Sequence, residues 1–277
     1  MTPPPGLCWQ GENLVCRFHK SIYGLKKASR NWFSTFATIV KSAGYIQSKA
    51  NYSLFTKSQG KKFIAILIYV DDILLIGNDL HEIKLLKSHM LKHFLIKDLG
   101  ELKYFMGIEF SRSKRGIFMS QRKYALDILQ DTRLSGVKLK KFPMEQNLKL
   151  TNEDDEILHD LNKYLRLVGR LIYLTVTKLD IVCLVRTLSQ FMNTSRKLHW
   201  EATLRVLRYI KGTLGQGLFL PYENNLTLNA YCDSDWGGCR TTRRFISGYC
   251  VFLGPSLISW KSKKQTNVSH SLAEAEY

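Results

Sequence analysis

The stretch LIYVDDILLIG, residues 67–77, decides how this chain of 277 residues is interpreted. Two aspartates, Asp71 and Asp72, interrupt a run of apolar and β-branched side chains that is typical of a buried strand. Burying an ionised carboxylate costs several kcal/mol unless it is paired or bound to a metal. We therefore interpret residues 61–77 as a hairpin whose tight turn carries both carboxylates.

Two explanations of this acidic turn stay open from the residues alone. Aspartate tolerates the backbone of a hairpin turn, and on that explanation the pair has no further role. However, the strand before it is apolar on both faces, and the usual turn residues Gly and Asn are absent. A metal site accounts for both observations, because Mg²⁺ prefers hard oxygen ligands. Two such ions about 3.5–4 Å apart can clamp the attacking and leaving oxygens of a phosphoryl transfer.

The charge of the chain indicates a polyanionic partner. Lys and Arg number 41 against 23 Asp and Glu, which gives a formal net charge of +18. Nucleic acid is the leading candidate and an anionic membrane surface the weaker one. A merely basic soluble protein is disfavoured, because the excess is clustered in residues 17–30, 199–211 and 240–264. We expect the helix 199–211 to present Arg205, Arg208 and Lys211 near one face.

The remaining composition favours an intracellular protein. Six cysteines without a CxxC pair are typical of reduced thiols and not of a disulfide framework or a zinc site. No apolar run is long enough for a signal peptide or a membrane span. We expect a soluble protein of the cytoplasm, or of the nucleus, that is neither secreted nor bound to a membrane.

Periodicity assigns the other elements. Apolar residues recur at helical spacing in 28–44 and 83–94, and again from 120 onward. A polar stretch, 138–163, is interpreted as a linker before three helical segments at 164–177, 180–192 and 199–211. The strand-like segments outside the hairpin are 102–111, 116–121, 217–222, 226–232, 246–254 and 257–262, and a last helix begins at 271.

Several blocks, in order along the chain, resemble the Pol polyprotein of copia-type LTR retrotransposons. They include SIYGLKKASRNWF (21–33), LIYVDDILLIG, DLGELKYFMGIEF (98–110), LVGRLIYLTVTKLDIV (167–182), YCDSDWGGC (231–239) and SLAEAEY (271–277). The resemblance implies an α+β fold: reverse-transcriptase fingers and palm in 1–123 and a helical thumb and connection in 124–212. An incomplete ribonuclease H-like α/β sheet would follow in 213–277.

The same resemblance implies a set of functional residues. Asp71 and Asp72 would bind Mg²⁺ or Mn²⁺ beside the primer end, and Asp233 and Glu276 would be metal-binding catalytic carboxylates of the ribonuclease H site. The residues expected to contact nucleotide or nucleic acid are Tyr23, Gly24, Lys26, Lys27, Arg30, Tyr69, Val70, Arg243, Arg244, Lys263 and Lys264. The implied partners are RNA, DNA, RNA–DNA hybrid and deoxynucleoside triphosphates, within a cytoplasmic virus-like particle.

A third polymerase carboxylate and two further ribonuclease H carboxylates of the family have no match within residues 1–277. We therefore expect a chain that is truncated at both ends and inactive on its own. A non-catalytic basic nucleic-acid-binding remnant and a relic with no selected role remain the alternatives. In the shortened last sheet, we expect apolar residues such as Phe252, Ile258 and Trp260 to leave one face uncovered.

Overall fold

The computed structural model describes residues 25, 27–134, 136–145, 150, 156–239 and 242–276. Within these residues helices and three antiparallel sheets alternate along the chain, so the expected α+β class is confirmed. The chain forms two compact units, one ending at Glu101 and the other beginning at Leu102. Each unit is described by itself.

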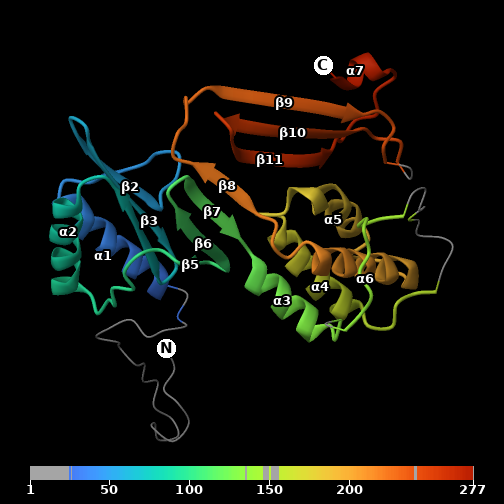
Figure 1. Cartoon of the computed structure of the whole chain (residues 1–277), viewed down its shortest axis with the longest axis horizontal. Coiled ribbons are helices and arrows are strands. Elements are labelled where there is room, and N and C mark those ends of the chain that lie inside the picture. Colours follow the sequence, from blue (N-terminus) through green and yellow to red (C-terminus); the bar gives the residue numbers. More distant parts are fainter. Residues whose placement is uncertain are drawn as a thin grey trace, which may run out of the picture. The chain divides into compact units, whose positions relative to one another are not determined.

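The first unit is a four-stranded sheet with two helices (Figure 1). Its elements are α1 (Ala28–Ser42), β1 (Ile46–Gln47), β2 (Leu54–Gln59), β3 (Lys62–Tyr69), β4 (Asp72–Gly77) and α2 (Leu80–His93). The strand order is β1-β2-β3-β4, so β3 is an inner strand. Ile64, Ile66 and Ile68 of β3 are buried in one cluster with residues of both helices, such as Phe36 and Leu86. Both helices therefore cover the same face of the sheet.

Local signals explain where the helices of this unit begin and end. Gly44 adopts φ +87° just after α1, a conformation that glycine reaches without steric cost. Asp79 begins α2, and its carboxylate accepts the backbone N–H groups of His81 and Glu82. The hydrogen bond from Lys62 is the largest cause that lowers the pKa of Asp79. The short strands β1 and β2 were not predicted, because their half-exposed residues carry only a weak apolar alternation.

The second unit contains a second four-stranded sheet, ordered β5-β6-β7-β8. Its strands are β5 (Tyr104–Phe105), β6 (Ile108–Ser113), β7 (Gly116–Ser120) and β8 (Leu218–Pro221). The stretch 102–111, expected as one strand, is a hairpin, because Met106 and Gly107 both adopt positive φ and reverse the chain. β8 lies in the segment expected to form a separate ribonuclease H-like sheet, but it pairs with β7 instead. The predicted domain bounds remain a prediction.

A helical core lies between β7 and β8 in the chain. It is built from α3 (Arg122–Asp131), α4 (Leu161–Leu174), a 3-10 turn (Leu179–Ile181), α5 (Val182–Ser189) and α6 (Lys197–Gly212). The buried Tyr164 of α4 donates its hydroxyl to the carbonyl of Leu188 at 2.8 Å, and burial raises its pKa. Asp180 accepts the hydroxyl of Tyr209 at 2.6 Å. None of the helices in the described residues is both long and apolar enough to cross a membrane.

The last sheet has three strands in the order β11-β10-β9 and is followed by a short helix (Figure 1). Its elements are β9 (Leu228–Asp235), β10 (Ile246–Leu253), β11 (Ser256–Lys264) and α7 (Leu272–Glu276).

This sheet is tied to the helical core through β11. The indole N–H of Trp260 donates to the carbonyl of Thr175 at 3.1 Å, and Arg186 of α5 donates to the carbonyl of Ser262. Trp260 is thus partly buried, with one polar contact to the helical core. Ile258 is 48% exposed. It lies where the register between β10 and β11 shifts, and such a bulge leaves the extra residue unpaired.

Candidate metal and nucleic-acid site

The hairpin between β3 and β4 has a two-residue turn, Val70–Asp71, closed by the pair Tyr69 and Asp72. The predicted turn, Asp71–Asp72, was therefore misplaced by one residue, and Asp72 is the first residue of β4. Val70 adopts φ +50°, in the left-handed region that a β-branched residue rarely occupies. That conformation costs about 1–2 kcal/mol for an L-residue. The turn is therefore held in a strained conformation by the strands on either side.

The two faces of this hairpin differ. Residues directly opposite each other in an antiparallel pair point to the same face, so Asp72 shares a face with Tyr69, and Leu74 shares that face with Leu67. Ile68 and its partner Ile73 belong to the other face, which packs against α1 and α2. The carboxylate of Asp72 thus lies on the sheet face away from both helices.

The turn is open to solvent and carries unneutralised charge. Asp71 and Asp72 are both exposed, and neither forms an ion pair with any described residue. Two adjacent carboxylates with no cation nearby repel each other, and a divalent ion would relieve that repulsion while finding its preferred oxygen ligands. The donor set therefore fits Mg²⁺ or Mn²⁺. Within the described part of the chain, no group of three or more His, Cys, Asp or Glu side chains is placed to hold a metal ion.

The residues expected to bind nucleotide lie mostly beyond the described ranges. Tyr23, Gly24 and Lys26 are outside them. Lys27 precedes the first residue of α1 and Arg30 lies in its first turn, and both are exposed. No acidic residue lies in this first turn, so the two cations reinforce the positive end of the helix dipole.

The carboxylates assigned to the ribonuclease H site lie on adjacent elements. Asp233 is exposed on β9 opposite Gly248 of β10. Glu276 is the last residue of α7, and α7 packs against β9. The structure does not describe the side chain of Glu276. The indole N–H of Trp236, just after β9, donates to the carbonyl of Ser269 at 2.9 Å, which ties the segment before α7 to the end of β9.

The basic residues near the last sheet do not form one surface. Lys263 is exposed, whereas Lys264 points to the opposite face and donates to Oε1 of Gln190 at 2.8 Å. The guanidinium of Arg243 lies 6.0 Å from the ring centre of Trp236, and the backbone carbonyl of Arg244 accepts the N–H of Cys239.

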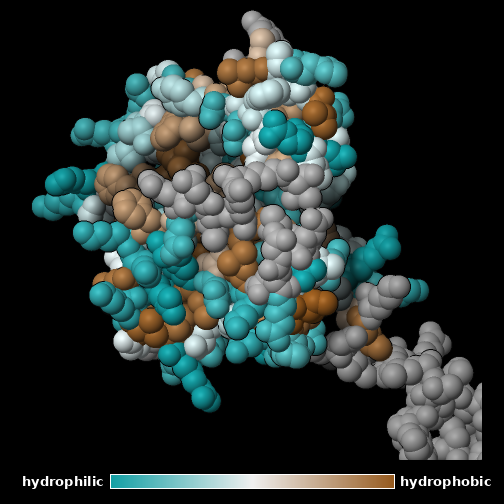
Figure 2. Space-filling view, turned by 90° about the vertical axis from the view of Figure 1, so that its right-hand side faces the viewer, coloured by the Kyte–Doolittle hydropathy of each residue, from teal (hydrophilic) through white to brown (hydrophobic). Residues whose placement is uncertain are grey.

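On α6, two of the three predicted phosphate ligands have partners within the protein. Arg205 forms an ion pair with Glu145, and Lys211 donates to the carbonyl of Val137 at 2.9 Å. These contacts hold the segment 136–145 along the helix. This segment exposes Lys138, Lys140 and Lys141, which sequence reasoning missed although three lysines in four positions were a visible signal. Figure 2 looks onto this end of the second unit, where hydrophilic residues are broken by separate hydrophobic patches.

Comparison with known proteins gives the family. Residues 1–146 match the model of the reverse transcriptase (RNA-dependent DNA polymerase) family. The whole chain is similar to the retrovirus-related Pol polyproteins from transposon RE2 of Arabidopsis thaliana, at 41% identity, and from transposon TNT 1-94 of Nicotiana tabacum, at 34%. It spans 19% and 22% of the length of those two proteins.

A third relative has a length closer to that of this chain. An uncharacterized mitochondrial protein of Arabidopsis thaliana is 39% identical over 76% of this chain, and the match covers 88% of that protein. No solved structure matches. The matched family model and the relatives confirm the resemblance read from the sequence, and the chain belongs to the reverse transcriptase family, within the Pol polyproteins of copia-type retrotransposons.

Proposed function

We propose that this chain is part of an RNA-directed DNA polymerase in which Asp71 and Asp72 hold the divalent metal at the primer end. The observation that carries the proposal is the exposed, unpaired carboxylate pair at the tip of the β3–β4 hairpin. The substrates would be deoxynucleoside triphosphates and an RNA or DNA template with its primer. The net charge of +18 supports a polyanionic substrate.

The residues of the turn would have separate roles. A bound divalent ion would stabilise the charge that develops on the reacting phosphate oxygens. Asp71 and Asp72 would supply its carboxylate ligands, and Tyr69, on the same face as Asp72, would offer an aromatic side chain to the adjacent nucleotide. Val70, exposed at the tip, would contact the nucleic acid backbone or sugar. The rigid strands would hold these groups in place, because β3 is an inner strand anchored in the core.

Replacement of Mg²⁺ by Fe²⁺ tests the metal assignment without requiring turnover. With added hydrogen peroxide, bound Fe²⁺ is oxidised to Fe³⁺ and the peroxide is split into hydroxide and a hydroxyl radical, which cuts nucleic acid close to the ion. We expect cuts in a bound primer–template next to the primer end, and we expect Asp71→Asn with Asp72→Asn to remove them. The matched control is Asp127→Asn, which removes one exposed carboxylate from α3. Cuts that persist unchanged in the double variant would show that the pair does not bind the metal.

Primer extension separates a polymerase from a non-catalytic nucleic-acid-binding remnant. Extension of a primer by the chain, lost in Asp71→Asn and retained in Asp127→Asn, would establish the polymerase reaction at this turn. Metal-dependent cutting without extension fits both the binding remnant and a polymerase site that lacks the carboxylate with no match within residues 1–277.

We also propose that Asp233 and Glu276 belong to a second metal site that cleaves the RNA of an RNA–DNA hybrid. The packing of α7 against β9 supports this proposal, because it places the two elements side by side. Asp233→Asn should abolish hybrid cleavage without affecting primer extension. Loss of both activities together would contradict two separate sites.

A further inference from the structure

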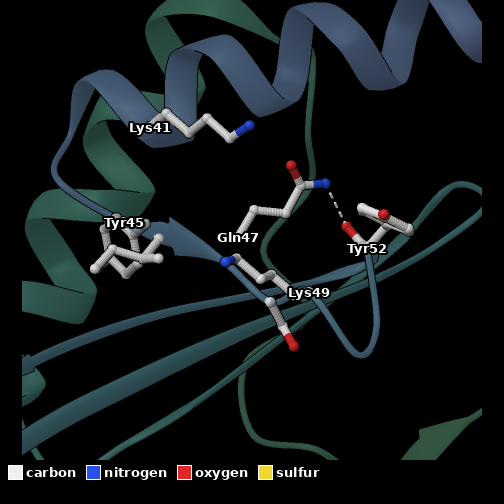
Figure 3. A pocket seen from close by; sticks show the side chains of 7 residues that line it. Lys41, Tyr45, Gln47, Lys49 and Tyr52 are labelled. Atoms are coloured by element: carbon white, nitrogen blue, oxygen red, sulfur yellow. Dashed lines mark hydrogen bonds between the residues drawn. The ribbon is translucent and has the colours of Figure 1, made fainter.

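A hollow of about 420 Å³ lies in the first unit, beside the edge strand β1. It is formed by the end of α1, the edge strand β1 and the loop that follows it, and its lining residues are Lys41, Tyr45, Ile46, Gln47, Ser48, Lys49 and Tyr52. Figure 3 shows Lys41 reaching from the helix on one side of Gln47, with Lys49 on the other side. This volume is within the usual range for a small-ligand site.

The loop beside the hollow is held by its own hydrogen bonds. The side-chain amide of Gln47 donates to the carbonyl of Tyr52 at 2.7 Å, the bond drawn in Figure 3. The hydroxyl of Ser48 accepts the backbone N–H groups of Ala50 and Asn51 at 3.2 and 3.3 Å. Because these bonds use backbone atoms of the loop, its shape does not depend on the side chains of Lys49 and Tyr52. A ligand would meet a preformed wall.

The lining carries positive charge and an aromatic surface. Lys41 and Lys49 are exposed, no acidic residue lines the hollow, and neither lysine forms an ion pair with a described residue. Tyr52 is 71% exposed and Ile46 is 73% exposed, so two large apolar surfaces face solvent beside two free cations. Cations and an exposed aromatic ring around one hollow are the combination that binds a phosphate and a base in single strands.

We propose that this hollow binds one nucleotide unit of single-stranded RNA or DNA, with the base stacked on Tyr52 and the phosphate between Lys41 and Lys49. The inference rests on the proposed function, because it assigns a second contact for the same nucleic acid. The loop adjoins the strand that leads to the turn, since the backbone N–H of Ile68 donates to the carbonyl of Ser53 at 3.0 Å. A strand held in the hollow would thus be tied to the same rigid sheet as Asp72.

The salt dependence of binding tests the two lysines. Binding of the full chain to a fluorescent oligothymidylate is measured over a range of salt concentrations. Each phosphate contact in single strands contributes about 0.7 to the log–log slope, so Lys41→Gln with Lys49→Gln, which removes the contact to one phosphate, should make the slope shallower by about 0.7. The matched control is Lys84→Gln with Lys92→Gln, two exposed lysines of α2, which should leave the slope unchanged.

The ring of Tyr52 is tested separately. Tyr52→Ala should weaken oligothymidylate binding about 5- to 150-fold, the range for loss of one stacked base, whereas Tyr52→Phe should retain it. The control is Tyr222→Ala, which removes a tyrosine that is also exposed. Rescue by phenylalanine distinguishes stacking from a loss of folding.

The outcomes separate this inference from the proposed function. If the wild-type chain binds the oligonucleotide but the hollow and control variants behave alike, the hollow is not a binding site, and the polymerase proposal stands. If the wild-type chain binds no nucleic acid, both proposals fail. Thymidine monophosphate or inorganic phosphate can be added as a competitor of the oligonucleotide. If either displaces it at a concentration as low as that at which the oligonucleotide binds, the occupant of the hollow is a free nucleotide or phosphate and not a strand.

Discussion

Replacement of Val70 by asparagine should stabilise the first unit. Val70 adopts φ +50° at the tip of the hairpin, and asparagine tolerates that conformation far better than a β-branched residue. Relief of the left-handed strain is worth about 1–2 kcal/mol. Val70 is 64% exposed, so its burial contributes only about a third of the 1.5–3 kcal/mol of a fully buried valine. The strain relief should therefore exceed the lost burial by about 0.5–1 kcal/mol.

Native-state hydrogen exchange of the amides in β3 and β4 measures the change in stability of the first unit separately from the second. A gain of about 0.5–1 kcal/mol slows exchange about two- to fivefold where the amides open with the unit. The control is Val268→Asn, because Val268 is 52% exposed and has a negative φ. Exchange in Val70→Asn that is no slower than in the control would refute the assignment of strain to this turn.

Two other features give measurable expectations. Burial lowers the pKa of Lys178, and the nearby Asp180 opposes that shift. The unfolded chain therefore binds more protons than the folded one as the pH approaches 10.5, and the free energy of unfolding should rise with pH in wild type relative to Lys178→Met. A pH-independent difference between the two proteins would contradict this. Tyr173→Phe removes the hydrogen bond to the carbonyl of Met106 at the β5–β6 turn, which should cost about 0.5–1.5 kcal/mol. We expect faster hydrogen exchange than in wild type in residues 104–113, with no change in β3. Exchange in residues 104–113 at the wild-type rate would show that this hydrogen bond does not stabilise the hairpin.

Much of the local structure could be predicted because it depends on short-range patterns. The apolar stripe that includes Phe36 predicted α1, and the continuous apolar run before Asp71 predicted an inner strand. The position of the turn could not be predicted, because turn propensities favour aspartate at both central positions and disfavour Val70 in a left-handed conformation. The strands that enclose the turn override that preference. A one-residue shift matters here, since it places Asp72 in the strand and thereby fixes which face its carboxylate occupies.

The pairing of strands that are far apart in the sequence could not be predicted from local patterns. β8 has the same apolar character as the strands that follow it, so nothing in its residues indicated that it pairs with β7, about a hundred residues earlier. Charge clusters are ambiguous for a related reason. The sequence gives the number of cations, but the fold determines which of them are free to bind phosphate. Arg205 forms an ion pair with Glu145, and Lys264 donates a hydrogen bond to Gln190.

The same reasoning explains why the hollow beside β1 was not predicted from residues. Lys41 and Lys49 belong to no dense basic run, and Tyr52 stands in a polar loop between two weak strands. Only the pairing of β1 with β2 brings the end of α1 and the loop around one space. The pairing of β2 with β3 links the loop to β3 through Ser53 and Ile68. A contact for nucleic acid can therefore arise where net charge is locally modest, provided that the fold leaves its cations without ion-pair partners and places an exposed ring around the same hollow.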